Sequence, residues 1–348
     1  MKRVLMIVIA ALVVVAISSC TKEGPQGPPG QNGTNGQDAN ATCGQCHNFS
    51  DTIVAKIMQY NNSQHATGST TFEGAVGCAP CHTSQGFTEV IVTGLDETAA
   101  EVEGGAAINC RTCHKIHETY TNADYALRYN SPVALRIGGT LDLTGGNGTA
   151  DLCSKCHQPR KRTPWPDDEF SVTYPGDSVN ITSSRYNPHY GPQSTILAGM
   201  GAWDLPGSSV YGNSPHRDAL SCTDCHGAKA VGILGGGHTL KVAFEEEGEE
   251  AYNTAVCEGC HPDIGDDFNY EGVQDEIQML EDSLKNMMVA KGWITSSGSL
   301  VVPQYFHKNE LRVIWNWGMV HYDRSLGVHN YKYSRDILQA GIDWVGAN

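Results

Sequence analysis

The sequence has few basic residues and no apolar run long enough to cross a membrane. Lys and Arg total 23 against 38 Asp and Glu, which gives the 348 residues a formal net charge of −15. Such acidity disfavours nucleic acid and anionic membrane surfaces as partners and favours basic redox proteins, cationic surfaces or metal ions. The apolar stretch Val4 to Ile17 has only 14 residues, and a spanning helix needs about 20.

That short apolar stretch is typical of a signal peptide. Lys2 and Arg3 precede it, and Ile17-Ser-Ser-Cys20 after it has the form of a bacterial lipobox. We predict a lipoprotein signal peptide over 1–19, with Cys20 acylated. The protein would then be exported and anchored to a bacterial membrane, at the outer membrane or cell surface rather than the inner membrane. The alternative is an ordinary cleaved signal that leaves Cys20 free.

A low-complexity segment follows the predicted anchor. Residues 24–38 form five Gly-X-Y triplets, the period of collagen, but they contain only three prolines. We expect residues 20–41 to be an extended spacer, with trimerisation through these triplets as the alternative.

Apart from Cys20, no cysteine lies outside a repeated motif. Twelve of the 13 cysteines form six C-x-x-C-H sequences, which are Cys43-Cys46-His47, Cys78-Cys81-His82, Cys110-Cys113-His114, Cys153-Cys156-His157, Cys222-Cys225-His226 and Cys257-Cys260-His261. C-x-x-C-H is the attachment signature of haem c: the thiols bind the porphyrin covalently and the imidazole is the proximal iron ligand. The sequence therefore predicts six covalently bound haem c groups.

Two other cysteine chemistries use similar spacings. A disulfide framework also has an even number of cysteines, and zinc ribbons also contain C-x-x-C pairs. Neither requires a histidine after every second cysteine, so both explain this pattern poorly.

Eight of the 14 histidines lie outside the motifs, and six are enough to give every haem a second axial ligand. A haem with histidine on both faces is suited to electron transfer, whereas an open face is needed for a substrate. Met200 or Met319 could replace a histidine at one site.

Several stretches resemble the multihaem cytochrome c superfamily that includes cytochrome c554, hydroxylamine-oxidoreductase-like and pentahaem nitrite-reductase-like proteins. They are His189-Tyr-Gly-Pro-Gln, Ser214-Pro-His216 before the fifth motif, and Gly327-Val-His329-Asn. The resemblance implies distal ligation, often to a haem of another motif. We expect the distal ligands to be His65, His117, His189, His216, His238 and His329, with His307 and His321 in reserve. His117 would serve a neighbouring haem, that of Cys43 or Cys78.

The chain departs from the ammonia-forming nitrite reductases of that superfamily, because it has no C-x-x-C-K motif for a lysine-ligated catalytic haem. The resemblance therefore implies the arrangement of haems rather than catalysis, and we predict no catalytic residue. The haem count and Cys113-His114-x-x-His117 also resemble the hexahaem cytochromes that form conductive filaments.

The fold expected from these patterns is mostly α with extensive coil. Residues 42–271 would wrap around a chain of six haems, with a short helix over 51–60. Apolar spacing in 272–348 predicts three helices that pack on the haem region, at about 273–291, 303–321 and 329–345.

Together these observations predict an exported hexahaem cytochrome that carries electrons, in the periplasm or outside the cell, to a redox partner protein or an extracellular acceptor in anaerobic respiration. One alternative is a reductase of a small nitrogen or sulfur oxyanion at one open haem, with His307 or His321 beside Arg312 or Arg324. A third is a subunit of a homo-oligomeric filament.

Overall fold

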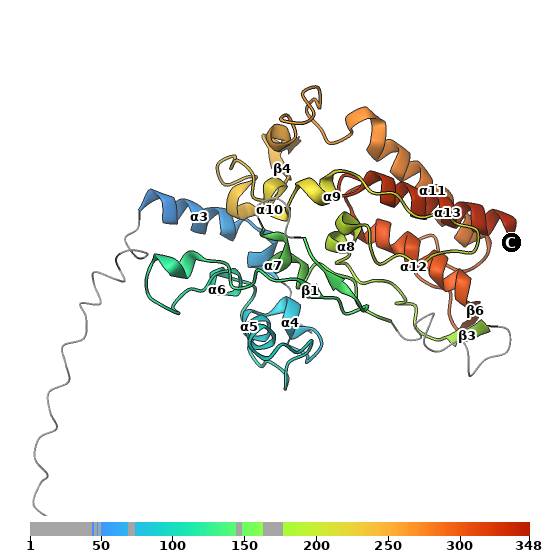
Figure 1. Cartoon of the computed structure of the whole chain (residues 1–348), viewed down its shortest axis with the longest axis horizontal. Coiled ribbons are helices and arrows are strands. Elements are labelled where there is room, and N and C mark those ends of the chain that lie inside the picture. Colours follow the sequence, from blue (N-terminus) through green and yellow to red (C-terminus); the bar gives the residue numbers. More distant parts are fainter. Residues whose placement is uncertain (1–43, 45–46, 48–49, 69–73, 144–147, 163–176) are drawn as a thin grey trace, which may run out of the picture. The chain divides into compact units, whose positions relative to one another are not determined.

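The computed structural model describes residues 44, 47, 50–68, 74–143, 148–162 and 177–348 (Figure 1). The chain divides into two units, Met1–Gly44 and Gln45–Asn348. Of the first unit only Gly44 is described, so the predicted signal peptide, Cys20 and the spacer lie outside the described residues, as do Cys43 and Cys46. In the described part, no helix is both long enough and apolar enough to cross a membrane.

The second unit is mostly helical with extensive coil, as the sequence predicted. Its first half contains short helices between long loops: α3 (Asp51–Asn61), η1 (Gln64–Thr67), α4 (Ala79–His82), α5 (Ser84–Thr93), α6 (Cys110–Cys113), η2 (Asn122–Tyr125), α7 (Ala150–Ser154) and α8 (Gln193–Ala198). Further along lie α9 (His216–Ala219), α10 (Cys222–Cys225), η4 (Gly237–Thr239), η5 (Thr254–Val256) and η6 (Tyr270–Gly272). The predicted helix at 51–60 is confirmed as α3.

The strands form three antiparallel pairs. They are β1 (Val133–Ala134) with β2 (Thr140–Leu141), β3 (Ser178–Ile181) with β6 (Gln304–His307), and β4 (Ala243–Glu246) with β5 (Glu249–Tyr252). The β3–β6 pair brings together segments far apart in the sequence, with Val179 opposite Phe306 and both side chains buried.

Three long helices end the chain: α11 (Val273–Ala290), α12 (Lys308–Asp323) and α13 (Tyr331–Ala347). Two begin and end close to the predicted helices at 273–291 and 329–345. The prediction was wrong for the start of the middle helix, because Gln304–His307 forms strand β6 and the helix begins only at Lys308. Residues 304–307 form a strand because they pair with β3. A local apolar pattern gives no information about a partner so far away in the sequence.

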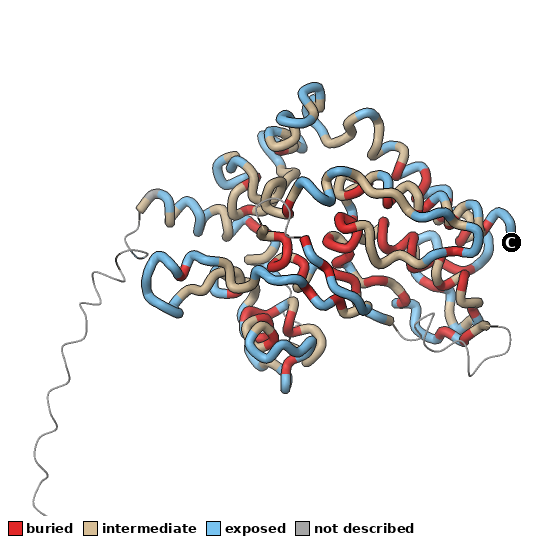
Figure 2. Tube along the Cα trace, in the orientation of Figure 1, coloured by how far each residue is buried: buried red, intermediate tan, exposed pale blue. Residues whose placement is uncertain are grey.

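The main hydrophobic core lies among these three helices, where Figure 2 shows most of the buried residues. Ile277, Leu284, Trp315 and Ile337 are completely buried there. Burying an aliphatic side chain of this size stabilises a fold by about 1.5–3 kcal/mol. A smaller cluster around β1, β2 and α7 contains Val133, Leu141 and Ala150. The cysteines of the described motifs are half-buried or exposed, and Cys222 packs against the smaller cluster.

Candidate functional site: six histidine pairs

Every described C-x-x-C-H motif forms one helical turn. The backbone N–H of the motif histidine donates to the carbonyl of the first cysteine, at 2.7–3.1 Å in His82, His114, His157, His226 and His261. In such a turn residues i, i+3 and i+4 share a face. Both thiols and the imidazole are therefore presented on the same side, as haem attachment requires.

Side-chain caps fix two of these turns. Asn109 accepts from the N–H of Arg111, and its own N–H donates to Thr112, which starts α6 beside Cys110. Ser221 precedes α10 in the same way, and its N–H donates to Asp224 at 2.6 Å. Capping residues of this kind stabilise a helix start by roughly 1 kcal/mol.

Each motif histidine faces one histidine from outside the motifs. The ring centroids are 5.9–6.3 Å apart in six pairs, which are His47–His117, His82–His189, His114–His238, His157–His65, His226–His329 and His261–His216. No two motif histidines pair with each other in the described part of the chain. The six partners are the histidines named above as expected distal ligands.

The spacing of the rings fits a haem iron. An imidazole nitrogen lies about 2 Å from a metal that it coordinates, and its centroid roughly 1 Å further away, so two axial imidazoles have centroids about 6 Å apart. The six pairs have this separation. Two cysteines and two histidines per site are also the donor set that a covalently bound, six-coordinate haem needs.

Hydrogen bonds at Nδ1 leave Nε2 available in several of these rings. The Nδ1 atoms of His114, His216 and His226 lie 2.7–3.0 Å from backbone carbonyl oxygens of Tyr125, Val328 and Leu240. His157 Nδ1 lies 3.2 Å from Gln193 Oε1, and His329 Nδ1 lies 2.6 Å from Asp323 Oδ1. A ligating histidine commonly donates its second N–H in this way, which fixes its tautomer and orientation.

Burial lowers the pKa of five of these imidazoles, which favours the neutral form that binds a metal; they are His65, His157, His189, His226 and His238. Burial, with a smaller contribution from His157, lowers the pKa of His65 to about 4. Burial and the nearby Arg160 and Arg162 lower the pKa of His189 to about 4 as well.

Two of the six partner histidines lie in left-handed backbone conformations. His117 has φ 66° and His189 has φ 72°, values that cost a side-chain-bearing residue about 1 kcal/mol or more. His117 is held by its neighbours: the carboxylate of buried Asp124 accepts from the N–H of His117 and of Thr119 at 2.7–2.8 Å. His189 donates its N–H to Asn187 Oδ1 at 2.9 Å. No pattern in the sequence indicates these backbone conformations.

The remaining two histidines have other partners. His307 caps α12, where its Nδ1 accepts from the N–H of Asn309. His321 stacks on Trp317 with centroids 4.5 Å apart, and its Nδ1 lies 2.7 Å from Glu281 Oε1. Among the described residues neither ring faces a motif histidine.

The arginines named for the reductase alternative and the methionines named as alternative axial ligands also have other surroundings. Arg312 stacks over Trp203, and Arg324 caps the carboxyl end of α12. Met319 is completely buried in the core of the three long helices, and Met200 packs against the smaller cluster.

Segments of different motifs contact one another. Cys81 Sγ lies 3.9 Å from the carbonyl oxygen of Lys155, and Cys156 Sγ lies 3.9 Å from that of Pro80. Thr149, just before the fourth motif, has its Oγ1 2.7 Å from Ser221 Oγ and also contacts Thr223 of the fifth motif. The fourth motif therefore touches both the second and the fifth.

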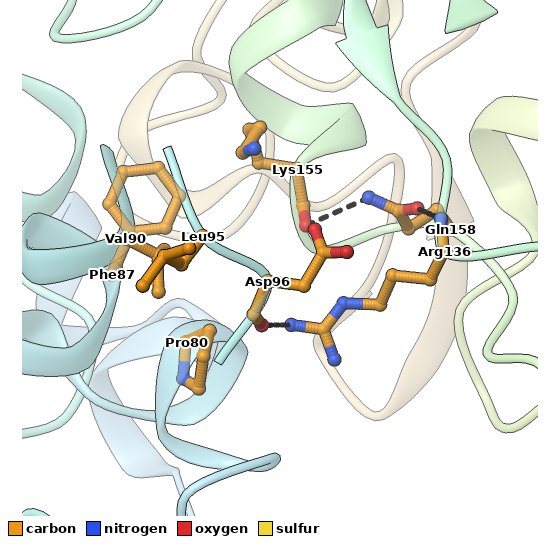
Figure 3. A pocket seen from close by; sticks show the side chains of 8 residues that line it. All are labelled: Pro80, Phe87, Val90, Leu95, Asp96, Arg136, Lys155 and Gln158. Carbon is orange, nitrogen blue, oxygen red and sulfur yellow. Dashed lines mark hydrogen bonds between the residues drawn. The ribbon is translucent and has the colours of Figure 1, made fainter. Parts of the chain in front are cut away.

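Arg136 joins the segments of the second and fourth motifs (Figure 3). Its guanidinium donates to the carbonyls of Asp96 and Gly77, at 2.6 and 3.3 Å, and its backbone N–H donates to Gln158 Oε1 at 2.8 Å. Arg136, Asp96 and Gln158 line a small cavity with Pro80, Phe87 and other side chains, none of which is a histidine or a cysteine. The cavity thus belongs to the scaffold around the histidine pairs.

No protein-family model matches the chain, and neither does any curated protein. Two solved cytochromes are similar in structure. The Outer Cell Wall Cytochrome OcwA is 18% identical with a TM-score of 0.49, over 83% of this chain and 50% of OcwA. The undecaheme cytochrome from the S-layer of Carboxydothermus ferrireducens is 16% identical with a TM-score of 0.48, over 88% of this chain and 45% of its own. The chain thus spans half or less of each.

Proposed function

We propose that this protein is an exported six-haem c-type cytochrome that carries electrons. The observation that supports the proposal best is the pairing of each motif histidine with a second histidine at 5.9–6.3 Å. Two axial imidazoles leave the iron no open position for a substrate. Six such sites therefore favour electron transfer over catalysis.

Numbered in the order of their motifs, haems 1 to 6 would have His47, His82, His114, His157, His226 and His261 as proximal ligands. Their distal ligands would be His117, His189, His238, His65, His329 and His216 respectively. The bound haem supplies a one-electron iron couple. The chain holds each imidazole in place and sets the polarity around it.

Contacts between the motifs suggest the order of the sites. His114 and His117 are three residues apart but belong to different pairs, which links sites 3 and 1. Cys81 contacts Lys155 of the fourth motif, and Thr149 before that motif contacts Ser221 before the fifth, so site 4 adjoins sites 2 and 5. Cys153 also lies near Cys113, and Cys257 lies near Cys225.

These neighbours give a branched array with haem 4 as its junction. One arm runs through haem 3 to haem 1, a second ends at haem 2, and a third runs through haem 5 to haem 6. Electrons could then enter by one arm and leave by another, between a redox partner protein and an extracellular acceptor.

Spectroscopy of the purified holoprotein tests the proposal. A pyridine haemochrome assay should give six haems per chain. Electron paramagnetic resonance should show low-spin iron only, unchanged by cyanide or nitrite. A high-spin fraction that binds either ligand would instead support the reductase.

We include in the proposal that Cys20 anchors the protein to a membrane. The lipobox sequence that ends at Cys20 supports this part. A Cys20→Ser variant should move from the membrane fraction to the soluble fraction without a change in its visible spectrum. Retention in the membrane fraction would contradict the anchor and leave electron transfer unaffected.

A further inference from the structure

The Nδ1 partner of His329 differs in charge from the Nδ1 partners described for four other paired histidines. Asp323 is the last residue of α12, and its side chain is completely buried. Its Oδ1 lies 2.6 Å from His329 Nδ1, and its Oδ2 accepts from the hydroxyl of Ser325. Ser325 Oγ in turn accepts the backbone N–H of His329 at 3.2 Å. The side chains of Asp323 and Ser325, with the backbone N–H of His329, thus fix the imidazole.

Neutral oxygens occupy the corresponding place at four other rings. The Nδ1 atoms of His114, His216 and His226 face backbone carbonyls, and that of His157 faces an amide oxygen. Among the paired histidines with a described Nδ1 partner, His329 alone faces a carboxylate.

Helix stability does not explain Asp323. A negative charge at the carboxyl end of a helix is unfavourable, because the helix dipole is negative there. A buried carboxylate also loses its hydration and needs compensating hydrogen bonds. The bonds to Ser325 and His329 supply that compensation. The placement therefore benefits the histidine rather than α12.

The charge of Asp323 acts on both rings of this pair. Burial lowers the pKa of His329, but the attraction and hydrogen bond of Asp323 outweigh burial and raise that pKa overall. Burial is also the main cause of the lowered pKa of His226, and Asp323 opposes it there.

We propose that Asp323 is a positioning residue that holds His329 as a distal ligand and lowers the reduction potential of haem 5. This inference rests on the proposed function. The hydrogen bond keeps the proton on Nδ1 and directs Nε2 to the iron, and it gives the imidazole partial anionic character. Negative charge there stabilises the oxidised iron, which carries one more positive charge. Only an electron is exchanged at this site, since the proton stays between His329 and Asp323.

A low potential at haem 5 has a consequence for the array. An electron is less stable there than on a neighbour with a neutral hydrogen-bond acceptor. Haem 5 then acts as a step between haems 4 and 6 rather than as a place where electrons accumulate.

The test is a redox titration of the holoprotein carrying Asp323→Asn, followed by visible absorption and electron paramagnetic resonance. Asparagine can still accept from Nδ1 but has no charge. One of the six one-electron steps should move to higher potential by at least tenfold in its equilibrium constant, about 59 mV. The matched control is Glu281→Gln, because Glu281 makes the same contact with His321 at 2.7 Å and His321 faces no motif histidine. It should leave all six steps in place.

A second variant acts in the opposite direction. Ser325→Ala removes the hydroxyl that shares the charge of Asp323, so the same step should move to lower potential. This variant also provides the test if Asp323→Asn does not fold. Unchanged steps in both variants would overturn the role of Asp323.

His329→Ala separates this inference from the proposed function. A single haem should become high-spin in that variant. If it does, and the Asp323 and Ser325 variants shift nothing, only the inference fails. If every haem stays low-spin, His329 is not a distal ligand, and the inference about Asp323 is then wrong as well.

Discussion

The imidazoles of His47 and His117 have centroids 6.3 Å apart and planes inclined by 28°, although the helices from α3 to α6 lie between them in sequence. Three residues before His117, the ring of His114 faces His238 at the same separation. One short stretch therefore contributes to two pairs. Under the proposed ligation it fixes haems 1 and 3 next to each other, and its backbone becomes part of the electron path.

Replacing Asp124 should release the distal side of haem 1. Its carboxylate accepts from the N–H groups of His117, Thr119 and Tyr120, and these bonds outweigh burial and lower its pKa. Without them the left-handed turn at His117 loses its support, so Asp124→Ala should make a fraction of one haem high-spin in electron paramagnetic resonance. Asp267→Ala, which removes a carboxylate from an exposed turn, is the control. Equal spectra for both variants would contradict the role of the turn.

The pairing of His82 with His189 predicts that His189→Ala converts one haem, haem 2, to the high-spin state. The remaining haems should keep their low-spin signals, because the other pairs contain neither residue. His321→Ala is the matched control: its ring stacks on Trp317 and binds Glu281. A high-spin signal in His321→Ala rather than in His189→Ala would reverse the assignment.

The junction at haem 4 can be tested by removing its attachment site. A Cys153→Ala, Cys156→Ala variant should bind five haems and should be reduced in separate phases in stopped flow, because electrons can no longer pass between the three arms. A Cys257→Ala, Cys260→Ala variant also binds five haems but loses only the end of one arm. It should be reduced as uniformly as the wild-type protein. Uniform reduction of the motif 4 variant would rule out the junction.

Two glycines of α13 give a stability prediction for the helical core. A Cβ on Gly341 would lie 2.7 Å from Leu284 Cδ2, and Leu284 is completely buried in α11. A Cβ on the exposed Gly346 meets only Met287 Cε, at 3.8 Å. Both changes to alanine gain up to about 1 kcal/mol of helix propensity, but overpacking costs about 1–3 kcal/mol at 341 only.

Chemical denaturation should therefore show Gly341→Ala to be less stable than Gly346→Ala by about 1–3 kcal/mol. Equal stability would mean that α11 and α13 pack more loosely than the structure indicates.

Local patterns predicted part of this fold well. The apolar spacing of Val273, Ile277, Leu284 and Met288 predicts α11, because one face of a helix repeats every three to four residues. The same reasoning placed a helix start at Pro303, where the chain instead forms β6. The strand partner, Ser178–Ile181, is so distant in sequence that the residues around Pro303 do not indicate the pairing.

The sequence by itself determined the proposed attachment sites, because two thiols and an imidazole on one helical turn need only five consecutive residues. It also singled out the six further histidines that the structure brings beside the motifs. Which histidine faces which motif was decided only by the tertiary structure. His65 reaches His157 past two intervening motifs, and Asp323 meets His329 at the end of a helix. The His65–His157 pair forms where two distant segments of the chain meet, and that meeting depends on the packing of the whole unit.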